Sequence, residues 1–295
     1  MDSRLERKLQ YAAAWCGPVF LVGYLISFGL LGHNHPPPSP AYTPLELVEH
    51  YFRPYHQQIM VGMIICMVVG VFYLPWAAVM SRVMLRKEHS SPVLSSISLL
   101  GGGLTAWILA EFPGKILHAA YYGSSQPVLQ ESIWREAWFI YDMTYMVTGF
   151  EMIAVGIYAL TDKSDSPVWP RWAGWVAIGG ALSFWPESFV PYFHTGPLAL
   201  NGLWNFWIAF PWWLIWFGIY SFYMLRYLRR QLIENAKEPI RARVEVTPEV
   251  SELGDRSLEL DPGHTGRPGR WRRRGGCRSR RSPDLAGVRS QAALR

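Results

Sequence analysis

The stretch QQIMVGMIICMVVGVFYLPWAAVMS, residues 57–81, contains no charged side chain and decides the fold class. A helix rises ~1.5 Å per residue, so it needs ~20 apolar residues to cross a hydrocarbon core of ~30 Å. The stretch is long enough for that, and it lacks the two-residue alternation of a membrane barrel strand. A helix also satisfies its own backbone hydrogen bonds in lipid. The stretch therefore predicts a transmembrane helix.

Further apolar segments of similar length are spread over residues 1–230. They cover residues 11–31, 93–112, 134–160, 172–190 and 203–224. Hydrophobic residues make up 50% of the chain, and its 15 tryptophans are far more than a soluble domain of this size usually carries. The sequence therefore predicts an all-α, polytopic membrane helix bundle with six transmembrane helices.

The first apolar segment follows Arg4, Arg7 and Lys8, an arrangement that is also typical of a secretory signal. The apolar run from Tyr11 to Leu31 is longer than a signal core of ~7–15 residues. We therefore expect a retained first helix, with a cleaved signal as the alternative.

Loops that are rich in Lys and Arg alternate along the chain with loops that contain few of them. One side of the predicted bundle carries Arg4, Arg7, Lys8, Arg82, Arg86, Lys87, Lys163, Arg171, Arg226, Arg229 and Arg230. The other side carries Arg53, Lys115 and Arg135. Because short loops rich in Lys and Arg stay in the cytoplasm, we predict that both termini are cytoplasmic. The protein is expected to be multi-pass in the inner or plasma membrane.

Residues 231–295 have a different composition from the rest of the chain. They hold most of its excess positive charge, including the run RPGRWRRRGGCRSRR at residues 267–281. A segment so poor in apolar residues is typical of a disordered, basic cytoplasmic tail. Its arginines would attract anionic membrane lipids. The tail has no nucleic-acid-binding module, so nucleic acid is not an expected partner. An arginine-rich and glycine-rich sequence of this kind is also typical of a gene end that is translated in a shifted reading frame, which is the alternative.

Polar side chains gather in the predicted outer half of the bundle. Glu111, Lys115, His118 and Tyr122 are spaced by four, three and four residues, which places them on one helix face. The last three apolar segments, and the loop before the final one, add further polar and aromatic residues in the same half. These are Arg135, Trp138, Asp142, Tyr145, Glu187, His194, Asn201, Trp204 and Asn205. The pattern favours a pocket open to the outer side; surface ion pairs such as Glu111 with Lys115 are the structural alternative.

The carboxylates and the histidine in this group are candidates for proton transfer. If the pocket is catalytic, we expect Glu111, His118, Asp142 and Glu187 to converge on it. The chain has no HxxxH or HExxH spacing, and its 3 cysteines form no CxxC pair. We therefore predict no metal site. The sequence identifies no cofactor.

Glu151 is separate from this group, because it lies inside an apolar segment about 10 Å from the predicted cytoplasmic end. A carboxyl group at that depth should be protonated, paired with a neighbouring helix, or part of a proton path.

The segment from Asn201 through Trp204 and Asn205, followed by Pro211, resembles the last helix of the emopamil-binding, sterol-isomerase type of membrane proteins. The resemblance covers about a dozen residues. It implies that an Asn and a Trp of one helix line an apolar pocket together with acidic residues from other helices. The predicted helix count differs from that family, and its His and Glu pair has no match here.

The favoured function is to bind an apolar small molecule or a lipid in the outer-half pocket, as a binding protein, an accessory protein or a subunit of a membrane-protein complex. One alternative is an intramembrane enzyme that moves protons on a lipid or sterol, as an isomerase does. A small secondary transporter is the other alternative, although no inverted repeat is visible.

Overall fold

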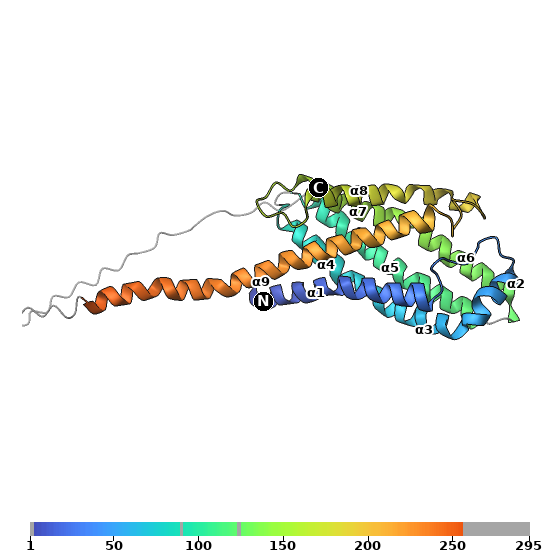
Figure 1. The fold of residues 1–295 in the computed structure, drawn as a ribbon, viewed down its shortest axis with the longest axis horizontal. Coiled ribbons are helices and arrows are strands. Elements are labelled where there is room, and N and C mark those ends of the chain that lie inside the picture. Colours follow the sequence, from blue (N-terminus) through green and yellow to red (C-terminus); the bar gives the residue numbers. More distant parts are fainter. Residues whose placement is uncertain (1–2, 89–90, 123–124, 256–295) are drawn as a thin grey trace, which may run out of the picture. The chain divides into compact units, whose positions relative to one another are not determined.

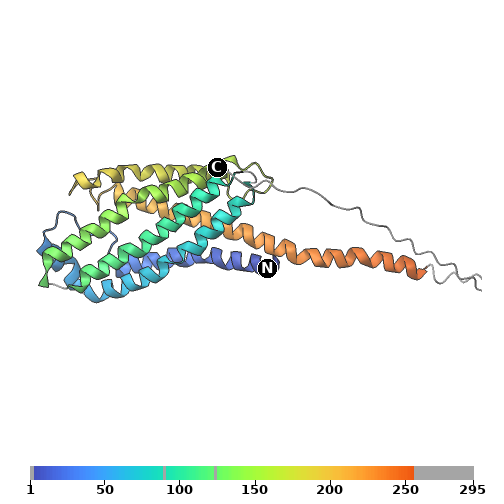
Figure 2. The same cartoon turned by 180° about the vertical axis from the view of Figure 1, so that it is seen from behind.

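The structure is a computed structural model that describes residues 3–88, 91–122 and 125–255. Its contacts divide the chain into two units, Met1–Arg241 and Ala242–Arg295, and the helical bundle belongs to the first. All regular secondary structure in the described ranges is helical (Figures 1 and 2). The all-α prediction is therefore confirmed.

The elements follow one another in a simple order along the chain. They are α1 (Ser3–Tyr24), η1 (Leu25–Leu31), α2 (Pro44–Leu47), η2 (Val48–Phe52), α3 (Arg53–Gly70), α4 (Tyr73–Leu85), α5 (Val93–Tyr121), α6 (Pro127–Met143), α7 (Tyr145–Thr161), α8 (Arg171–Ser183), η4 (Trp185–Tyr192), η5 (Asn205–Ala209) and α9 (Phe210–Asp255). The helices of the bundle run roughly alongside one another (Figure 1).

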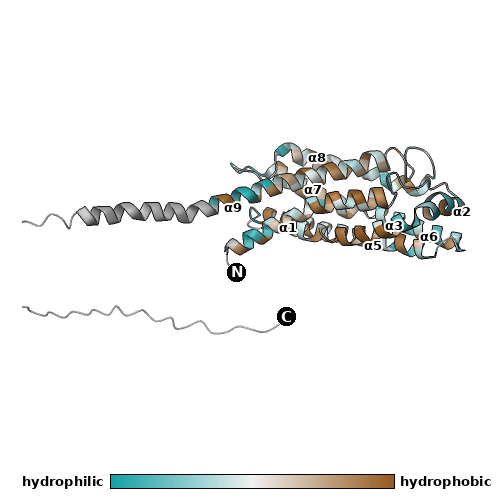
Figure 3. Ribbon diagram, turned by 60° about the horizontal axis from the view of Figure 1, so that its bottom comes forward, coloured by the Kyte–Doolittle hydropathy of each residue, from teal (hydrophilic) through white to brown (hydrophobic). Residues whose placement is uncertain are grey.

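Five helical segments in the described residues are long and apolar enough to cross a membrane. They are Leu5–Leu31, Pro44–Leu85, Val93–Tyr121, Pro127–Thr161 and Asn205–Glu234. Large apolar side chains also lie exposed on their outer faces, and hydrophobic residues predominate along α5 and α7 (Figure 3). These features fit an integral membrane protein. The sixth predicted span, residues 172–190, is divided between α8 and η4, so neither piece alone has the required length.

Several helix boundaries differ from the predicted ones. The segment predicted at 134–160 begins earlier, at Pro127, and is interrupted at Thr144, whose hydroxyl donates to the Ile140 carbonyl at 2.6 Å and so competes with the backbone. Helix α5 continues beyond the predicted end at residue 112 to Tyr121, although Pro113 lies inside it. Burial of Ile116 after the proline offsets the single backbone hydrogen bond that Pro113 removes.

Helix α9 extends through the first part of the predicted disordered tail. That tail was predicted for residues 231–295, and α9 continues within it to Asp255. Residues 231–255 contain five Glu residues, which are good helix formers, and also Pro239 and Pro248, which are poor ones. Disorder of the tail stays a prediction. The rest of the predicted tail, residues 256–295, lies outside the described residues, and so does the third cysteine, Cys277.

Helix α5 is the central element of the bundle, because it packs against α3, α4, α6 and α7. Its approach to α4 and α7 is close at two glycines. A Cβ atom at Gly101 would lie 2.8 Å from the Val147 carbonyl oxygen. A Cβ atom at Gly102 would lie 2.5 Å from the Cβ atom of Ala77 and 2.9 Å from Glu151 Oε1. Glycine is therefore required at both positions for the observed helix spacing.

Aromatic rings fill the space between α1, α4 and α9. Trp76 of α4 packs against Phe217 of α9 with ring centroids 4.1 Å apart, and Phe20 of α1 lies 5.1 Å from Phe217. Closer to α2, Phe28 contacts Phe210 at 5.8 Å. Rings of this size contribute much of the buried apolar area, and their edge-to-face contacts stabilise the packing.

Gly102 and its neighbour Gly103 provide a matched test of this packing. We expect Gly102→Ala to destabilise the bundle by about 1–3 kcal/mol, because its methyl group overpacks the contact with Ala77 and Glu151. A Cβ atom at Gly103 meets nothing within 4 Å, so Gly103→Ala should be neutral or slightly stabilising, since Ala is the better helix former. Thermal unfolding in detergent measures both. Equal midpoints for the two variants would show that the close approach at Gly102 is not tight.

Candidate functional site

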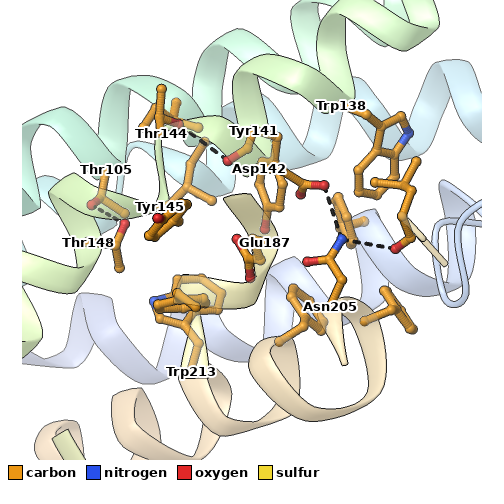
Figure 4. Close-up of a pocket in the computed structure, with 17 residues that line it drawn as sticks. Thr105, Trp138, Tyr141, Asp142, Thr144, Tyr145, Thr148, Glu187, Asn205 and Trp213 are labelled. Carbon is orange, nitrogen blue, oxygen red and sulfur yellow. Dashed lines mark hydrogen bonds between the residues drawn. The ribbon is translucent and has the colours of Figure 1, made fainter. Parts of the chain in front are cut away.

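A cavity of about 70 Å³ lies between α5, α6, α7, η4 and α9 (Figure 4). Its walls are Phe28, Thr105, Ile108, Leu109, Trp138, Tyr141, Asp142, Thr144, Tyr145, Thr148, Phe184, Glu187, Leu200, Asn205, Phe206, Phe210 and Trp213. A single water needs ~10–15 Å³ by this measure. The cavity can therefore hold several waters or the head of a small molecule.

Two carboxyl groups face this cavity from different parts of the chain. Asp142 is in the last turn of α6 and Glu187 is in the first turn of η4, and each is only 5% exposed. They are close enough for their charges to interact. No Lys, Arg or His side chain is among the described residues that line the cavity. The site is therefore acidic and has no basic group of its own to balance it.

Asn205 orients one of the two carboxyl groups. Its side-chain Nδ2 donates to Asp142 Oδ2 at 3.1 Å and to the Leu200 carbonyl oxygen at 3.0 Å. Asn205 is placed by the π-helical turn η5 that precedes α9. Glu187 accepts no hydrogen bond from the described residues, so its carboxyl group is free to interact with whatever occupies the cavity.

Aromatic rings form most of the remaining wall. Phe28 and Tyr141 stack with centroids 5.9 Å apart, and Phe206 stacks on Phe210 at 5.5 Å. The Tyr141 hydroxyl forms a 2.8 Å hydrogen bond with the Tyr24 hydroxyl behind the wall. A few polar groups inside aromatic walls are the usual composition of a small-molecule site.

A second cavity of about 40 Å³ adjoins the first and shares Trp138, Asp142 and Leu200 with it. Arg135 and His194 line this second cavity. The Arg135 guanidinium is bound to the Glu131 carboxylate and donates to the Pro40 carbonyl oxygen at 3.0 Å. Its charge is therefore already balanced outside the first cavity.

The predicted site residues on α5 do not reach either cavity. Lys115 Nζ lies 2.7 Å from Glu136 Oε1 and 3.6 Å from Glu111 Oε1, in a surface ion-pair cluster. The His118 ring packs against Tyr122 with centroids 5.3 Å apart. The expected convergence of four candidate catalytic residues is thus not found, because only Asp142 and Glu187 share a cavity.

The other predicted pocket residues are divided between the cavities and their surroundings. Tyr145 lines the first cavity, and its hydroxyl is 2.6 Å from Ser188 Oγ, next to Glu187. Trp204 points elsewhere: its indole donates to the Ser183 carbonyl oxygen at 2.8 Å. Asn201 lines neither cavity.

Sequence reasoning missed Thr105, Thr148 and Trp213 in the cavity wall. Thr148 lies three residues after Tyr145, so it is one turn further along the same face of α7. Thr105 pairs with it across the helices through a 2.8 Å hydrogen bond between the two hydroxyls. No sequence signal distinguishes Trp213 from the other tryptophans.

Glu151 lies one turn beyond Thr148 on α7 and does not line either cavity. It is completely buried, and the Tyr73 hydroxyl donates to its Oε2 at 2.8 Å. Its other oxygen, Oε1, has no hydrogen-bond partner. No group of three or more His, Cys, Asp or Glu side chains in the described ranges has the arrangement of a metal site.

No protein-family model matches the chain, and neither a curated protein nor a solved structure matches it. The resemblance to the emopamil-binding type is therefore limited to the motif itself. Asn205 does line an apolar pocket with two acidic residues, but Trp204 does not, and the tryptophans in its wall are Trp138 and Trp213.

Asn205 and Asn201 allow a matched test of the site geometry. Asn205→Leu should destabilise the protein by about 1–3 kcal/mol, because the buried Asp142 loses its donor. Asn201→Leu, which removes the same group from outside both cavities, should change stability by less than about 0.5 kcal/mol. Chemical or thermal unfolding in detergent gives both values. Similar losses in the two variants would contradict the role given to Asn205.

Proposed function

We propose that this chain is a six-span membrane protein that binds a small molecule with an apolar body and a positively charged group. The ligand occupies the cavity of Asp142 and Glu187 in the outer half of the bundle. The proposal follows from the observation that two buried carboxyl groups share a cavity whose described wall contains no basic side chain.

The charge of the cavity selects the class of ligand. An ionised carboxylate away from water is costly unless a cation or several donors accompany it, and two such groups side by side repel each other. Asn205 supplies one donor to Asp142, and Glu187 has none from the described residues. An ammonium group placed between the carboxyl groups would supply both the charge and the missing donors.

The aromatic walls favour the same ligand. A cation within ~6 Å of an aromatic ring face is attracted by the ring, and desolvation strengthens the attraction. Trp138, Tyr141 and Trp213 all border the cavity with the carboxyl groups. The first cavity suits the charged head, and the adjoining cavity near Trp138 offers space for an apolar body. A binding protein or an accessory subunit of a membrane complex is the role that this arrangement supports.

The sixth span is supported by the combined length of α8 and η4. They are separated by Phe184 alone, and 13 α-helical plus 8 3₁₀-helical residues reach about 36 Å at ~1.5 and ~2.0 Å per residue. That exceeds the ~30 Å of a hydrocarbon core. The exposed Trp175 and Phe189 on these two elements suit contact with lipid. With this span, the alternation of Lys and Arg places both termini in the cytoplasm.

The enzyme alternative retains only part of its support. Asp142 and Glu187 share a cavity and could act as an acid and base pair on a lipid substrate. Glu111 and His118 line neither cavity: Glu111 belongs to the surface ion-pair cluster, and the His118 ring packs against Tyr122.

The sixth span predicts opposite accessibility for two exposed loop residues, Ser166 before α8 and Thr195 after η4. In a chain without its native cysteines, Ser166→Cys should react with an impermeant maleimide only after the membrane is opened. Thr195→Cys should react in intact cells. Labelling of both from the same side would exclude a sixth crossing, and the reverse pattern would exclude the proposed orientation.

The ligand class can be tested with benzylamine and its neutral analogue benzyl alcohol. At pH 7 benzylamine should raise the unfolding temperature of the purified protein in a concentration-dependent way, because a ligand that binds only the folded state stabilises it. Benzyl alcohol at equal concentration should have a much smaller effect. Asp142→Asn and Glu187→Gln should each weaken benzylamine binding by about tenfold or more, which corresponds to ~1.4 kcal/mol.

The matched control is Glu111→Gln, which neutralises a carboxylate that is 34% exposed and outside both cavities. It should bind benzylamine like the unmodified chain. Equal binding of the amine and the alcohol, or unchanged binding by the Asp142 and Glu187 variants, would contradict the proposal.

A further inference from the structure

Glu151 is the one carboxyl group in the described membrane-spanning segments that is buried without facing a cavity. Its exposed fraction is 0%, and helix α4 contributes its one hydrogen bond, from Tyr73. Helix α5 presents Gly101 and Gly102 to it. Among the described residues, Tyr73 is the titratable side chain that contacts Glu151, and no Lys, Arg or His does.

This environment favours the neutral acid. An ionised Glu151 would keep a full negative charge with one donor on Oε2 and none on Oε1. The neutral acid leaves one unpaired oxygen, Oε1, without a charge, which is far less costly than an unpaired charge. The side chain packs closely against α5, because a Cβ atom at Gly102 would lie 2.9 Å from Oε1. Carboxyl groups at such depth in a membrane bundle are candidate proton-binding groups.

Hydroxyl groups lie between Glu151 and the cavity of Asp142 and Glu187. Tyr73 donates to Glu151, and the Thr105 hydroxyl is near Tyr73 although the structure has no hydrogen bond between the two. Thr105 and Thr148 share a 2.8 Å hydrogen bond, and both line the cavity, as does Trp213. Figure 4 shows this threonine pair at the cavity wall. One tyrosine hydroxyl therefore separates the buried acid from the cavity wall.

We propose that Glu151 is a proton-binding site that exchanges its proton with the cavity through the hydroxyl groups of Tyr73 and the Thr105–Thr148 pair. The proposal adds a second acidic site to the proposed function, and it requires only that water reaches the cavity. It holds whether or not a cationic ligand binds there.

The transfer requires O–H bonds only. To load Glu151, Tyr73 gives its hydroxyl proton to Oε2 of the ionised carboxylate, and the Thr105 hydroxyl turns toward Tyr73 and gives it a proton. Thr105 is restored from Thr148, and Thr148 from a water in the cavity. The net result is one proton moved from cavity water to Glu151, with each hydroxyl group returned to its neutral form. Release follows the reverse order, and no redox partner is needed.

Helix α5 continues the polar face away from the cavity. Ser98 lies four residues before Gly102, on the same helix face, and its buried hydroxyl has no hydrogen-bond partner in the structure. Ser95, one turn further, receives a hydrogen bond at its carbonyl oxygen from Ser81 at 2.7 Å, and its backbone N–H donates to Glu88 at 2.9 Å. Polar groups therefore follow α5 from the cavity toward the predicted cytoplasmic surface.

Deuterium exchange followed by infrared spectroscopy tests the proposed link. A protonated carboxyl group has a C=O band distinct from the ionised form, and the band shifts when its proton is replaced by a deuteron. The Glu151 band is the one that disappears in Glu151→Gln. After transfer of the purified, ligand-free protein to D₂O, we expect this band to shift roughly tenfold more slowly, or slower still, in Tyr73→Phe than in the unmodified chain, because the relay hydroxyl is missing.

Tyr158→Phe is the matched control. Tyr158 is another buried tyrosine of the bundle, on α7, and its hydroxyl has no hydrogen-bond partner in the structure. Its variant should exchange at the unmodified rate. Exchange at that rate in Tyr73→Phe would overturn the proposal, and so would the absence of any protonated band that depends on Glu151.

If Glu151→Gln does not fold, the band can be assigned in another way. In Glu187→Gln made with ¹³C-labelled glutamate, Glu151 is the buried glutamate that remains among the described residues, so the isotope-shifted band of a protonated glutamate belongs to it. Because these measurements contain no amine, their failure is distinguishable from failure of the proposed ligand class. If exchange depends on Tyr73 but the protein does not bind the amine, the proton link between Glu151 and the cavity is supported and the cationic ligand is rejected.

Discussion

Burial of carboxyl groups in an apolar bundle is the constraint on which the arrangement of its polar residues depends. Away from water, a carboxylate needs donors or a cation, and otherwise it must be neutral. Asp142 has Asn205, and Glu151 has Tyr73. Gly102 leaves the room that Glu151 needs between α5 and α7. Glu187 has no such donor among the described residues, so its cavity is where an external group would complete the arrangement.

Apolar length and charge were enough to predict the fold class and part of the site. Charged residues inside apolar segments are conspicuous, so Asp142, Glu187 and Glu151 could be selected from the sequence. The same reasoning also selected Glu111 and His118. Helical spacing identifies residues on one face of a helix, but not the neighbour that this face meets. On α5 the neighbour is Glu136 of α6, which converts the predicted catalytic stripe into a surface ion-pair cluster.

The remaining site residues could not be predicted, because their roles arise from tertiary packing. Hydroxyl groups such as those of Thr105, Thr148 and Tyr73 are common in membrane helices and carry no signal of their own. They come together only where α4, α5 and α7 approach closely at Gly101 and Gly102, with Thr105 bonded to Thr148 and Tyr73 bonded to Glu151. The division of the predicted segment 172–190 into α8 and η4 is also a local effect, since Pro186 and Pro191 lie in η4 and each lacks a backbone donor.

The two acidic sites constrain each other if both proposals hold. A cation between Asp142 and Glu187 is balanced best when both carboxyl groups are ionised, so any proton that the pair shares must leave as the ligand enters. If the ligand body fills the adjoining cavity at Trp138, the displaced proton would leave inward, by way of Tyr73 toward Glu151. Ligand entry and proton movement would thus proceed in the same direction through one cavity, and binding of the cation would favour loading of Glu151.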